Sequence, residues 1–421
     1  MPPTTLSEWL DYVERLHAKP IDMGLERVSR VRDKLGLKFA GPVITVGGTN
    51  GKGSTCAMLE AILQAAGYRV GLYASPHLLH YNERVRIDGV PVADERLATA
   101  FARANEVRED ISLTYFEFGT LAAWEVFASA ALDVLVLEVG LGGRLDAVNA
   151  FDADCAVVTS VGIDHVDYLG PTRAGIAFEK AGIFRAGRAA ICGDPQPPET
   201  LLAHAAAIGA DLQILGRDFG FDGGRQQWRY WGRRGERAGL APPALRGARQ
   251  LVNASAALAA LDALQQRIPV SMQAVREGLS RVELPGRFQV MPGSPSVVLD
   301  VAHNPQAAEV LAQNLVDQGF FANTRAVIGM LADKDMKGVC AALRGRIDEW
   351  HAAGLTGARA ASAAQLAAAI AESGAGGKVF QHASPRAAYA AARERSSEND
   401  RIVVFGSFLT VADILSVGVR N

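Results

Sequence analysis

The glycine-rich segment Gly47-Gly48-Thr49-Asn50-Gly51-Lys52-Gly53-Ser54 follows the apolar run at residues 42–46 and opens a helix-length stretch. This order constrains the fold most, because a strand, a glycine-rich turn and a helix N-terminus together direct several backbone N–H groups at one phosphate group. Lys52 adds a positive charge for the β- and γ-phosphate oxygens. We therefore predict a nucleoside triphosphate site directly after the first core strand. The loop residues expected to contact ATP are Thr49, Asn50, Gly51, Lys52, Gly53 and Ser54.

Strand-length runs of Val, Ile and Leu alternate with helix-length segments through the first half of the chain. Runs that are apolar on both faces predict buried strands, and their alternation with helices predicts a parallel sheet. We therefore expect a P-loop α/β domain with a doubly wound, mostly parallel sheet. The expected strands are residues 42–46, 69–73, 133–138 and 156–159, and the expected helices are residues 54–66, 94–109 and 116–131.

The pattern changes in the second half of the chain. Residues 211–249 are rich in Gly, Arg and Trp without a clear period, which favours short antiparallel strands or loops. After a helix expected at residues 251–264, a Pro-Gly pair at residues 285–286 interrupts the periodicity. A second α/β series then predicts a smaller, Rossmann-like C-terminal domain, so that the two domains span residues 1–292 and 293–421. Its expected strands are residues 296–300, 325–329 and 401–406, with an Ala-rich surface helix within residues 358–377.

Composition excludes several classes of protein. Hydrophobic residues make up 49% of the chain and charged residues 21%, which is typical of a globular enzyme. The net charge of -2 provides no general attraction for nucleic acid or an anionic membrane, so neither is expected as a partner. We find no secretory signal and no apolar run of about 18 residues, and we expect a cytoplasmic protein. The scattered cysteines are expected to be reduced core thiols: Cys56, Cys155, Cys192 and Cys340.

Polar residues follow three of the expected strands. Ser75 comes after the second strand, Glu138 ends the third, and Asp164 and His165 come after the fourth. Ligands of an open parallel sheet bind at the carboxyl ends of its strands, so these residues are candidates for a site. A carboxylate and a hydroxyl suit Mg²⁺, which indicates Glu138 and Ser75. His165 alone is as consistent with a core or hydrogen-bonding role as with a metal ligand.

The phosphate loop departs from the common G-x-x-x-x-G-K-[ST] pattern, because Val46 stands at its first glycine and Gly53 at its hydroxyl position. The variant Gly-Thr-Asn-Gly-Lys-Gly-Ser resembles the Mur ligase superfamily, and specifically its folate branch, the dihydrofolate and folylpolyglutamate synthases. The resemblance extends from about residue 20 to 412 and departs at Leu409, where the family more often has His. Further segments that resemble the branch are residues 20–28, 75–78, 113–117, 139–149, 160–165, 179–183, 284–288 and 300–305.

This resemblance implies roles for the strand-end residues. It makes residues 1–292 an ATP-binding central domain and residues 293–421 a glutamate-ligase domain. Ser75, Glu138 and His165 would bind two Mg²⁺ ions between ATP and the substrate. Lys180 matches a lysine that is often carbamylated in the family and helps to place the second ion; the alternative is a surface lysine in a charged pair with Glu179. The residues predicted to act in catalysis are thus Lys52, Glu138, His165 and Lys180.

The C-terminal half supplies the rest of the predicted nucleotide site. Asp300-Val301-Ala302-His303-Asn304-Pro305 resembles the family segment that holds the nucleotide, together with Arg287. Asn253 resembles an asparagine that contacts adenine. For Arg287 alone, a salt bridge in a linker is an equally plausible role. The resemblance therefore assigns Arg287, Asp300, His303 and Asn253 to ATP.

The resemblance also implies a reaction and its substrates. ATP would activate a carboxylate as an acyl phosphate, and the amine of L-glutamate would displace phosphate from dihydropteroate or from a folate. Phe116 could stack on a flat pterin, or it could simply belong to the core. Asp146 could accept hydrogen bonds from the amino-pyrimidine edge. The residues expected to bind this acid are Thr114, Phe116, Asp146 and Ala147.

Two other functions remain open at this stage. Another Mur-type amide ligase would normally have Gly-Lys-Thr-[Ser/Thr] in its loop and an additional N-terminal domain, whereas this loop already begins at Gly47. A P-loop switch that only holds or hydrolyses nucleotide would leave the motif at residues 300–305 and Lys180 unexplained. We therefore expect a small-molecule ligase that acts as a monomer.

Overall fold

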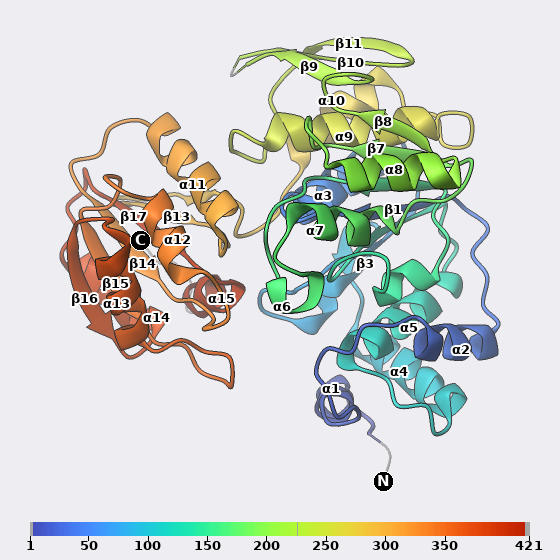
Figure 1. Cartoon of the computed structure of the whole chain (residues 1–421), viewed down its shortest axis with the longest axis horizontal. Helices are drawn as coiled ribbons and strands as arrows, with labels where there is room; N and C mark the ends of the chain where they lie inside the picture. Colours follow the sequence, from blue (N-terminus) through green and yellow to red (C-terminus); the bar gives the residue numbers. More distant parts are fainter. Residues whose placement is uncertain (1–2, 225, 417–421) are drawn as a thin grey trace. The chain divides into compact units, whose positions relative to one another are not determined.

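The fold is described from a computed structural model that covers residues 3–224 and 226–416. The chain forms two compact units, one that runs to Ala244 and includes residues 251–282, and one that contains residues 245–250 and the chain from Glu283 onward. Figure 1 shows the two units in blue to yellow and in orange to red. The boundary between the units therefore lies before Glu283. The strand β12 (Gln289–Met291) pairs with residues 297–299 and belongs to the second unit. The division into an ATP-binding domain at 1–292 and a glutamate-ligase domain at 293–421 stays a prediction.

The first unit is built on an eight-stranded sheet with the order β4-β3-β2-β5-β1-β6-β7-β8. The six strands from β2 to β8 in this order are parallel, and the antiparallel pairs are β2–β3 and β3–β4 at one edge. The predicted doubly wound, mostly parallel sheet is confirmed. Its strands are β1 (Val43–Gly47), β2 (Val70–Tyr73), β3 (Val85–Ile87), β4 (Val90–Pro91), β5 (Val134–Glu138), β6 (Cys155–Val158), β7 (Ala189–Cys192) and β8 (Asp211–Ile214).

Helices cover both faces of this sheet. Leu135 and Leu137 of β5 pack in one core with Phe118 and Leu121 of α5, while α3 contacts β1, β2 and β5. A second core packs α7 and α8 on β6 and β7, as Figure 1 shows. The helices are α1 (Leu6–Glu14), α2 (Glu26–Leu35), α3 (Lys52–Ala65), α4 (Asp94–Arg108), α5 (Tyr115–Ala128), α6 (Val166–Leu169), α7 (Arg173–Ala181), α8 (Glu199–Ile208), α9 (Gln250–Ala263) and α10 (Met272–Arg281), with 3-10 turns η1 (Tyr81–Arg84) and η2 (Ala147–Ala150).

Residues 211–249 divide between two sheets. The first of these strands, β8, joins the large parallel sheet. The remainder forms a separate antiparallel sheet with the order β11-β10-β9. Trp228 and Tyr230 of β10 are buried, which gives this small sheet an apolar face. Its strands are β9 (Gly220–Gly223), β10 (Trp228–Gly232) and β11 (Gly235–Leu240).

The second unit is a smaller α/β domain with the strand order β12-β13-β17-β14-β15-β16. The strands from β13 to β16 in this order are parallel, and β12 is an antiparallel edge strand. Its strands are β12, β13 (Ser296–Leu299), β14 (Thr324–Ile328), β15 (Glu349–Ala353), β16 (Lys378–His382) and β17 (Arg401–Phe405), and its helices are α11 (Pro305–Asp317), α12 (Met336–Ala342), α13 (Ala363–Ser373), α14 (Pro385–Glu394) and α15 (Phe408–Ser416).

Two expectations about the whole chain can be compared with the structure. All four cysteines are buried and unpaired, as expected for core thiols. Among the residues that the structure describes, no helix combines the length and apolar character needed to cross a membrane.

Candidate active site

The phosphate loop joins β1 to α3 and adopts backbone conformations that require glycine. Gly48 and Gly51 have φ angles of 141° and 91°, and Gly51 is the N-cap residue of α3. A Cβ atom on Gly51 would lie 2.5 Å from Oδ1 of Asn253, so the side chain of Asn253 is packed directly on the loop. The Lys52 ammonium donates to the carbonyl oxygens of Gly48 at 3.0 Å and Thr49 at 3.2 Å. Its side chain is therefore folded over the loop, where a phosphate group would lie.

The predicted metal ligands sit at the ends of neighbouring strands. Glu138 ends β5, is 4% exposed and accepts a hydrogen bond from the backbone N–H of Ser75 at 3.1 Å. This contact exists because β2 and β5 are adjacent and parallel. His165 has a left-handed backbone with φ 52°, which is strained for a residue other than glycine and is common at functional sites.

Within residues 3–224 and 226–416, no three His, Cys, Asp or Glu side chains form a ready metal cluster. A set of one carboxylate, one imidazole and one hydroxyl still suits Mg²⁺, because this ion usually takes only one or two carboxylates and fills its other positions with water and phosphate oxygens. The donor set at Ser75, Glu138 and His165 therefore fits a cation that binds together with a nucleotide.

Lys180 is a buried amine, not a surface lysine. Its residue is 4% exposed at the end of α7, and burial, with a further contribution from the charge of Lys52, lowers its pKa to about 7. Asp164 and Asp146 oppose this shift. A substantial fraction of the amine is therefore neutral near pH 7, which is the form that reacts with CO₂.

The residues predicted to bind the acid substrate lie around the glycine-rich turn after β5. Phe116 packs on Gly140, since a Cβ atom there would come within 2.5 Å of the ring, and its centroid lies 5.9 Å from that of Tyr73. Thr114 is the buried N-cap residue of α5, and its hydroxyl accepts a hydrogen bond from the N–H of Glu117 at 3.2 Å. Ala147 is buried as the first residue of η2. The structure thus brings these residues to one region.

Asp146 has a structural role in addition to any role in binding. Its two carboxylate oxygens accept hydrogen bonds from the N–H groups of Leu141 at 2.8 Å and Val148 at 3.0 Å. Burial raises the pKa of this carboxyl group to about 7, although hydrogen bonds from the backbone oppose the shift. The side chain therefore fixes the shape of the glycine-rich turn and retains lone pairs for a ligand.

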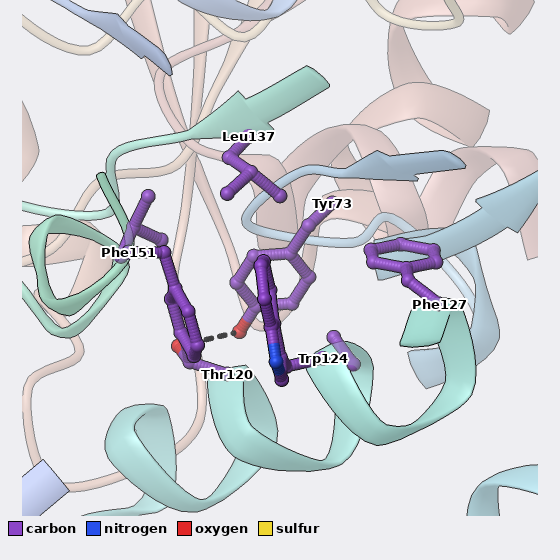
Figure 2. Close-up of a pocket in the computed structure, with 8 residues that line it drawn as sticks. Tyr73, Thr120, Trp124, Phe127, Leu137 and Phe151 are labelled. Carbon is purple, nitrogen blue, oxygen red and sulfur yellow. Dashed lines mark hydrogen bonds between the residues drawn. The ribbon is translucent and has the colours of Figure 1, made fainter. Parts of the chain in front are cut away.

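A small, mostly apolar cavity is lined by side chains from β2, α5, β5 and η2, together with Phe151 (Figure 2). Tyr73 and Thr120 provide its hydroxyl groups, which are 3.3 Å apart and joined by a hydrogen bond. Thr120 in turn donates to the carbonyl oxygen of Phe116 at 2.8 Å. The cavity is lined by Tyr73, Thr120, Ala123, Trp124, Phe127, Leu137, Val148 and Phe151. This chain of contacts links the core to the helical turn that carries Phe116.

Sequence reasoning assigned no role to two sets of residues around the site. Arg27 bridges Asp22 at 2.7 Å and Glu117 at 3.1 Å, so it connects the N-terminal segment to the start of α5. Thr159 and Ser160 contact the phosphate loop directly. Thr159 and Ser160 could have been found from the sequence, because they come immediately after β6 and residues at the ends of the neighbouring strands were selected on that ground.

In the second unit, the motif at residues 300–305 follows β13 and begins α11. Asp300 accepts hydrogen bonds from the N–H groups of Phe288 at 2.9 Å and Ala302 at 2.8 Å, which holds the strand end against the segment that contains Arg287. His303 donates from Nδ1 to the carbonyl oxygen of Val301 at 2.9 Å, since a carbonyl can only accept. The Arg287 guanidinium lies over the Phe408 ring, 5.0 Å from its centroid. Arg287 thus packs on an aromatic ring of the second unit.

Comparison with known proteins identifies relatives over nearly the whole chain. The family model of the Mur ligase middle domain matches residues 46–192, and that of the Mur ligase glutamate ligase domain matches residues 286–408. The chain is 48% identical to the dihydrofolate synthase/folylpolyglutamate synthase of Escherichia coli (strain K12), over 98% of this chain and 95% of the relative. It is 42% identical to the Haemophilus influenzae protein of the same name, over 98% and 97% of the two chains.

Solved structures agree with this similarity. The structure of E. coli FolC in complex with DHPP and ADP superposes with a TM-score of 0.94 at 46% identity and covers 99% of both chains. The Yersinia pestis bifunctional folylpolyglutamate synthase/dihydrofolate synthase, complexed with AMPPNP and Mn ion, superposes with a TM-score of 0.92 at 45% identity, again over 99% of both chains.

Proposed function

Because the chain belongs to the Mur ligase family, and within it to the dihydrofolate synthase/folylpolyglutamate synthases, we propose that it joins L-glutamate to dihydropteroate and to folates at the expense of ATP. The protein is an ATP-dependent ligase that forms ADP and phosphate. A carboxylate is a poor acyl donor, so its oxygen first accepts the γ-phosphoryl group of ATP, and the amine of L-glutamate then displaces phosphate from the acyl phosphate.

The observation that carries this proposal is that groups for phosphate and for an acid lie at one edge of the first sheet. Lys52 in the phosphate loop and Asp146 in the turn after β5 both contribute to the electrostatic environment of the buried Lys180. Lys52 offsets the charge of the phosphate oxygens during transfer. The phosphate loop and the glycine-rich turn after β5 would hold ATP and the acid substrate near each other, which lowers the entropic barrier of the reaction.

Two Mg²⁺ ions complete the proposed site. Ser75, Glu138 and His165 hold one or both of them, and the ions would supply positive charge to the triphosphate and to the transferred phosphoryl group. Lys180 contributes to the second ion as a carbamate. The buried amine, of which a substantial fraction is neutral near pH 7, supports this assignment, since an ammonium ion would be repelled by two cations and a carbamate provides an oxygen ligand.

The acid binds with its pterin against Phe116 and its polar edge towards Asp146, while Thr114 and Ala147 shape the pocket. For the nucleotide, the resemblance assigns Asn253 in the first unit and Arg287, Asp300 and His303 in the second. The contact between Asn253 and Gly51 supports the first of these assignments.

The decisive experiment measures ADP release by the purified protein with MgATP alone, with dihydropteroate, with L-glutamate, and with both. A ligase releases ADP only when acid and amine are present together, and mass spectrometry detects the amide product. A nucleotide switch would release ADP at one rate in all four mixtures, and that result would exclude the proposed function. Tetrahydrofolate in place of dihydropteroate tests the second activity. A cytoplasmic location and a monomeric state stay predictions, and the latter is checked by the solution mass.

A further inference from the structure

The segment Thr159–Gly162 makes a dense set of hydrogen bonds to the phosphate loop, and we call it the clamp segment. The hydroxyl of Ser160 accepts from the N–H of Asn50 and donates to its carbonyl oxygen, both at 3.0 Å. Thr159 donates to the carbonyl of Asn50 at 2.7 Å, and the Thr49 hydroxyl exchanges hydrogen bonds with Gly162 at 3.1 and 2.9 Å. The N–H of Thr49 donates to the Ser160 carbonyl at 2.9 Å.

The loop and the clamp segment are also complementary in shape. A Cβ atom on Gly48 would lie 2.0 Å from the Thr159 hydroxyl oxygen, so any other residue at position 48 would displace Thr159. The clamp segment is itself held in place by hydrogen bonds to Asp194 and Arg173. Asp194 accepts from the N–H of Val161 at 3.1 Å, and Arg173 donates to the Val161 carbonyl at 2.9 Å and to Asp194 at 2.6 Å.

These contacts decide which part of the loop can receive a phosphate group. The backbone N–H groups of Thr49 and Asn50 point to the clamp segment, and the Thr49 hydroxyl is shared with Gly162. The groups left to contact phosphate are therefore in the later part of the loop, at Lys52 and at the N-terminus of α3. The helix dipole also favours an anion there.

The clamp segment continues through Ile163 to Asp164 and His165, and the backbone of His165 is left-handed. We propose that the clamp segment fixes the conformation of the phosphate loop and links it to the turn that carries His165, which makes Thr159 and Ser160 positioning residues for MgATP. The inference rests on the proposed function only in naming ATP and Mg²⁺. The proposal predicts that loss of either hydroxyl weakens nucleotide binding and raises the Mg²⁺ concentration needed for activity. Binding of the acid substrate should change little.

The test uses the full chain and removes one hydroxyl at a time. Ser160→Ala and Thr159→Val remove the hydrogen bonds, while Thr159→Ser keeps a hydroxyl and serves as the conservative variant. Ser373→Ala is the matched control, because Ser373 is a buried serine of the second unit that donates to the Ile370 carbonyl at 2.6 Å and accepts from the Ala375 N–H at 3.1 Å. Calorimetry gives the Kd for ADP with and without Mg²⁺, and kinetics give KM for MgATP and for dihydropteroate.

We expect Ser160→Ala and Thr159→Val to raise the Kd for ADP and the KM for MgATP about tenfold each, the effect of about one hydrogen bond. Half-maximal activity should then require more Mg²⁺, and the KM for dihydropteroate should stay near the wild-type value. Thr159→Ser and Ser373→Ala should bind ADP as the wild type does.

Three results would overturn the inference: unchanged ADP affinity in both hydroxyl-free variants, an equal rise of the KM for dihydropteroate, or an unchanged Mg²⁺ requirement. Calorimetry does not need turnover. A wild type that binds ADP but forms no amide would therefore refute the proposed function and leave this test of the clamp segment intact.

Discussion

Replacement of Lys180 by Met should make the protein more stable while it removes ligase activity. The amine is almost fully buried, and its pKa is lowered from 10.5 to about 7. One pKa unit corresponds to about 1.36 kcal/mol. At pH 7 the shift therefore lowers the free energy of unfolding by about 4 kcal/mol relative to a lysine with an unperturbed pKa. Methionine is similar in length and carries no charge, so it avoids this penalty.

The pH dependence of the difference follows from the same shift. Between about pH 7 and 10.5 the unfolded state binds more protons at Lys180 than the folded state, so wild-type stability rises with pH in this window. The advantage of Lys180→Met in the free energy of unfolding should therefore fall from about 4 kcal/mol at pH 7 to about 2 kcal/mol at pH 9.

Urea denaturation at pH 7 and pH 9 measures this difference, in protein without nucleotide or metal and in buffer depleted of CO₂. Lys38→Met, at an exposed lysine of the same unit, is the control and should match the wild type at both values. A Lys180→Met protein that is less stable than the wild type at pH 7, or whose advantage does not change with pH, would refute the reasoning that burial lowers the pKa of the Lys180 amine to about 7.

Three other predictions concern separate parts of the chain. Lys52→Ala and Glu138→Ala should abolish ADP formation without changing the far-ultraviolet circular dichroism or Tm; turnover in either variant would remove that residue from the mechanism. Phe116→Leu should raise the KM for dihydropteroate about fivefold, the effect of one lost ring contact, with the KM for MgATP unchanged in the same kinetics. Burial and the neighbouring His382 lower the pKa of His351 to about 4, so this group should reduce the free energy of unfolding by roughly 3 kcal/mol as pH falls from 6.5 to 4. Between pH 6.5 and pH 4, the free energy of unfolding of His351→Phe should therefore fall by roughly 3 kcal/mol less than that of the wild type. Denaturation at both pH values measures this, and an equal fall in the two proteins would contradict the lowered pKa.

Much of the fold could be predicted because its signals are local. The strands expected from apolar runs, such as β1, β5 and β14, begin and end within one residue of their predicted positions. The strand at 211–214 was misplaced among the antiparallel segments, although it belongs to the parallel sheet as β8. Its sequence, Asp-Leu-Gln-Ile, is as compatible with an edge strand of one sheet as of another, and only strand pairing distinguishes them.

The phosphate loop and the alternation of strands and helices could be read from the amino-acid sequence alone. Glycine conformations, helix starts and apolar periodicity depend on neighbours along the chain, so Gly51 and Lys52 could be recognised from their immediate context. Only the tertiary structure showed that Ser160 and Thr159 hold the loop and that Asn253 packs on Gly51. These partners lie about a hundred residues or more away in sequence. Thr159 and Ser160 reach the loop because β6 pairs with β1, and Asn253 reaches it from α9; long-range packing sets both contacts, and neither has a signature in a single segment.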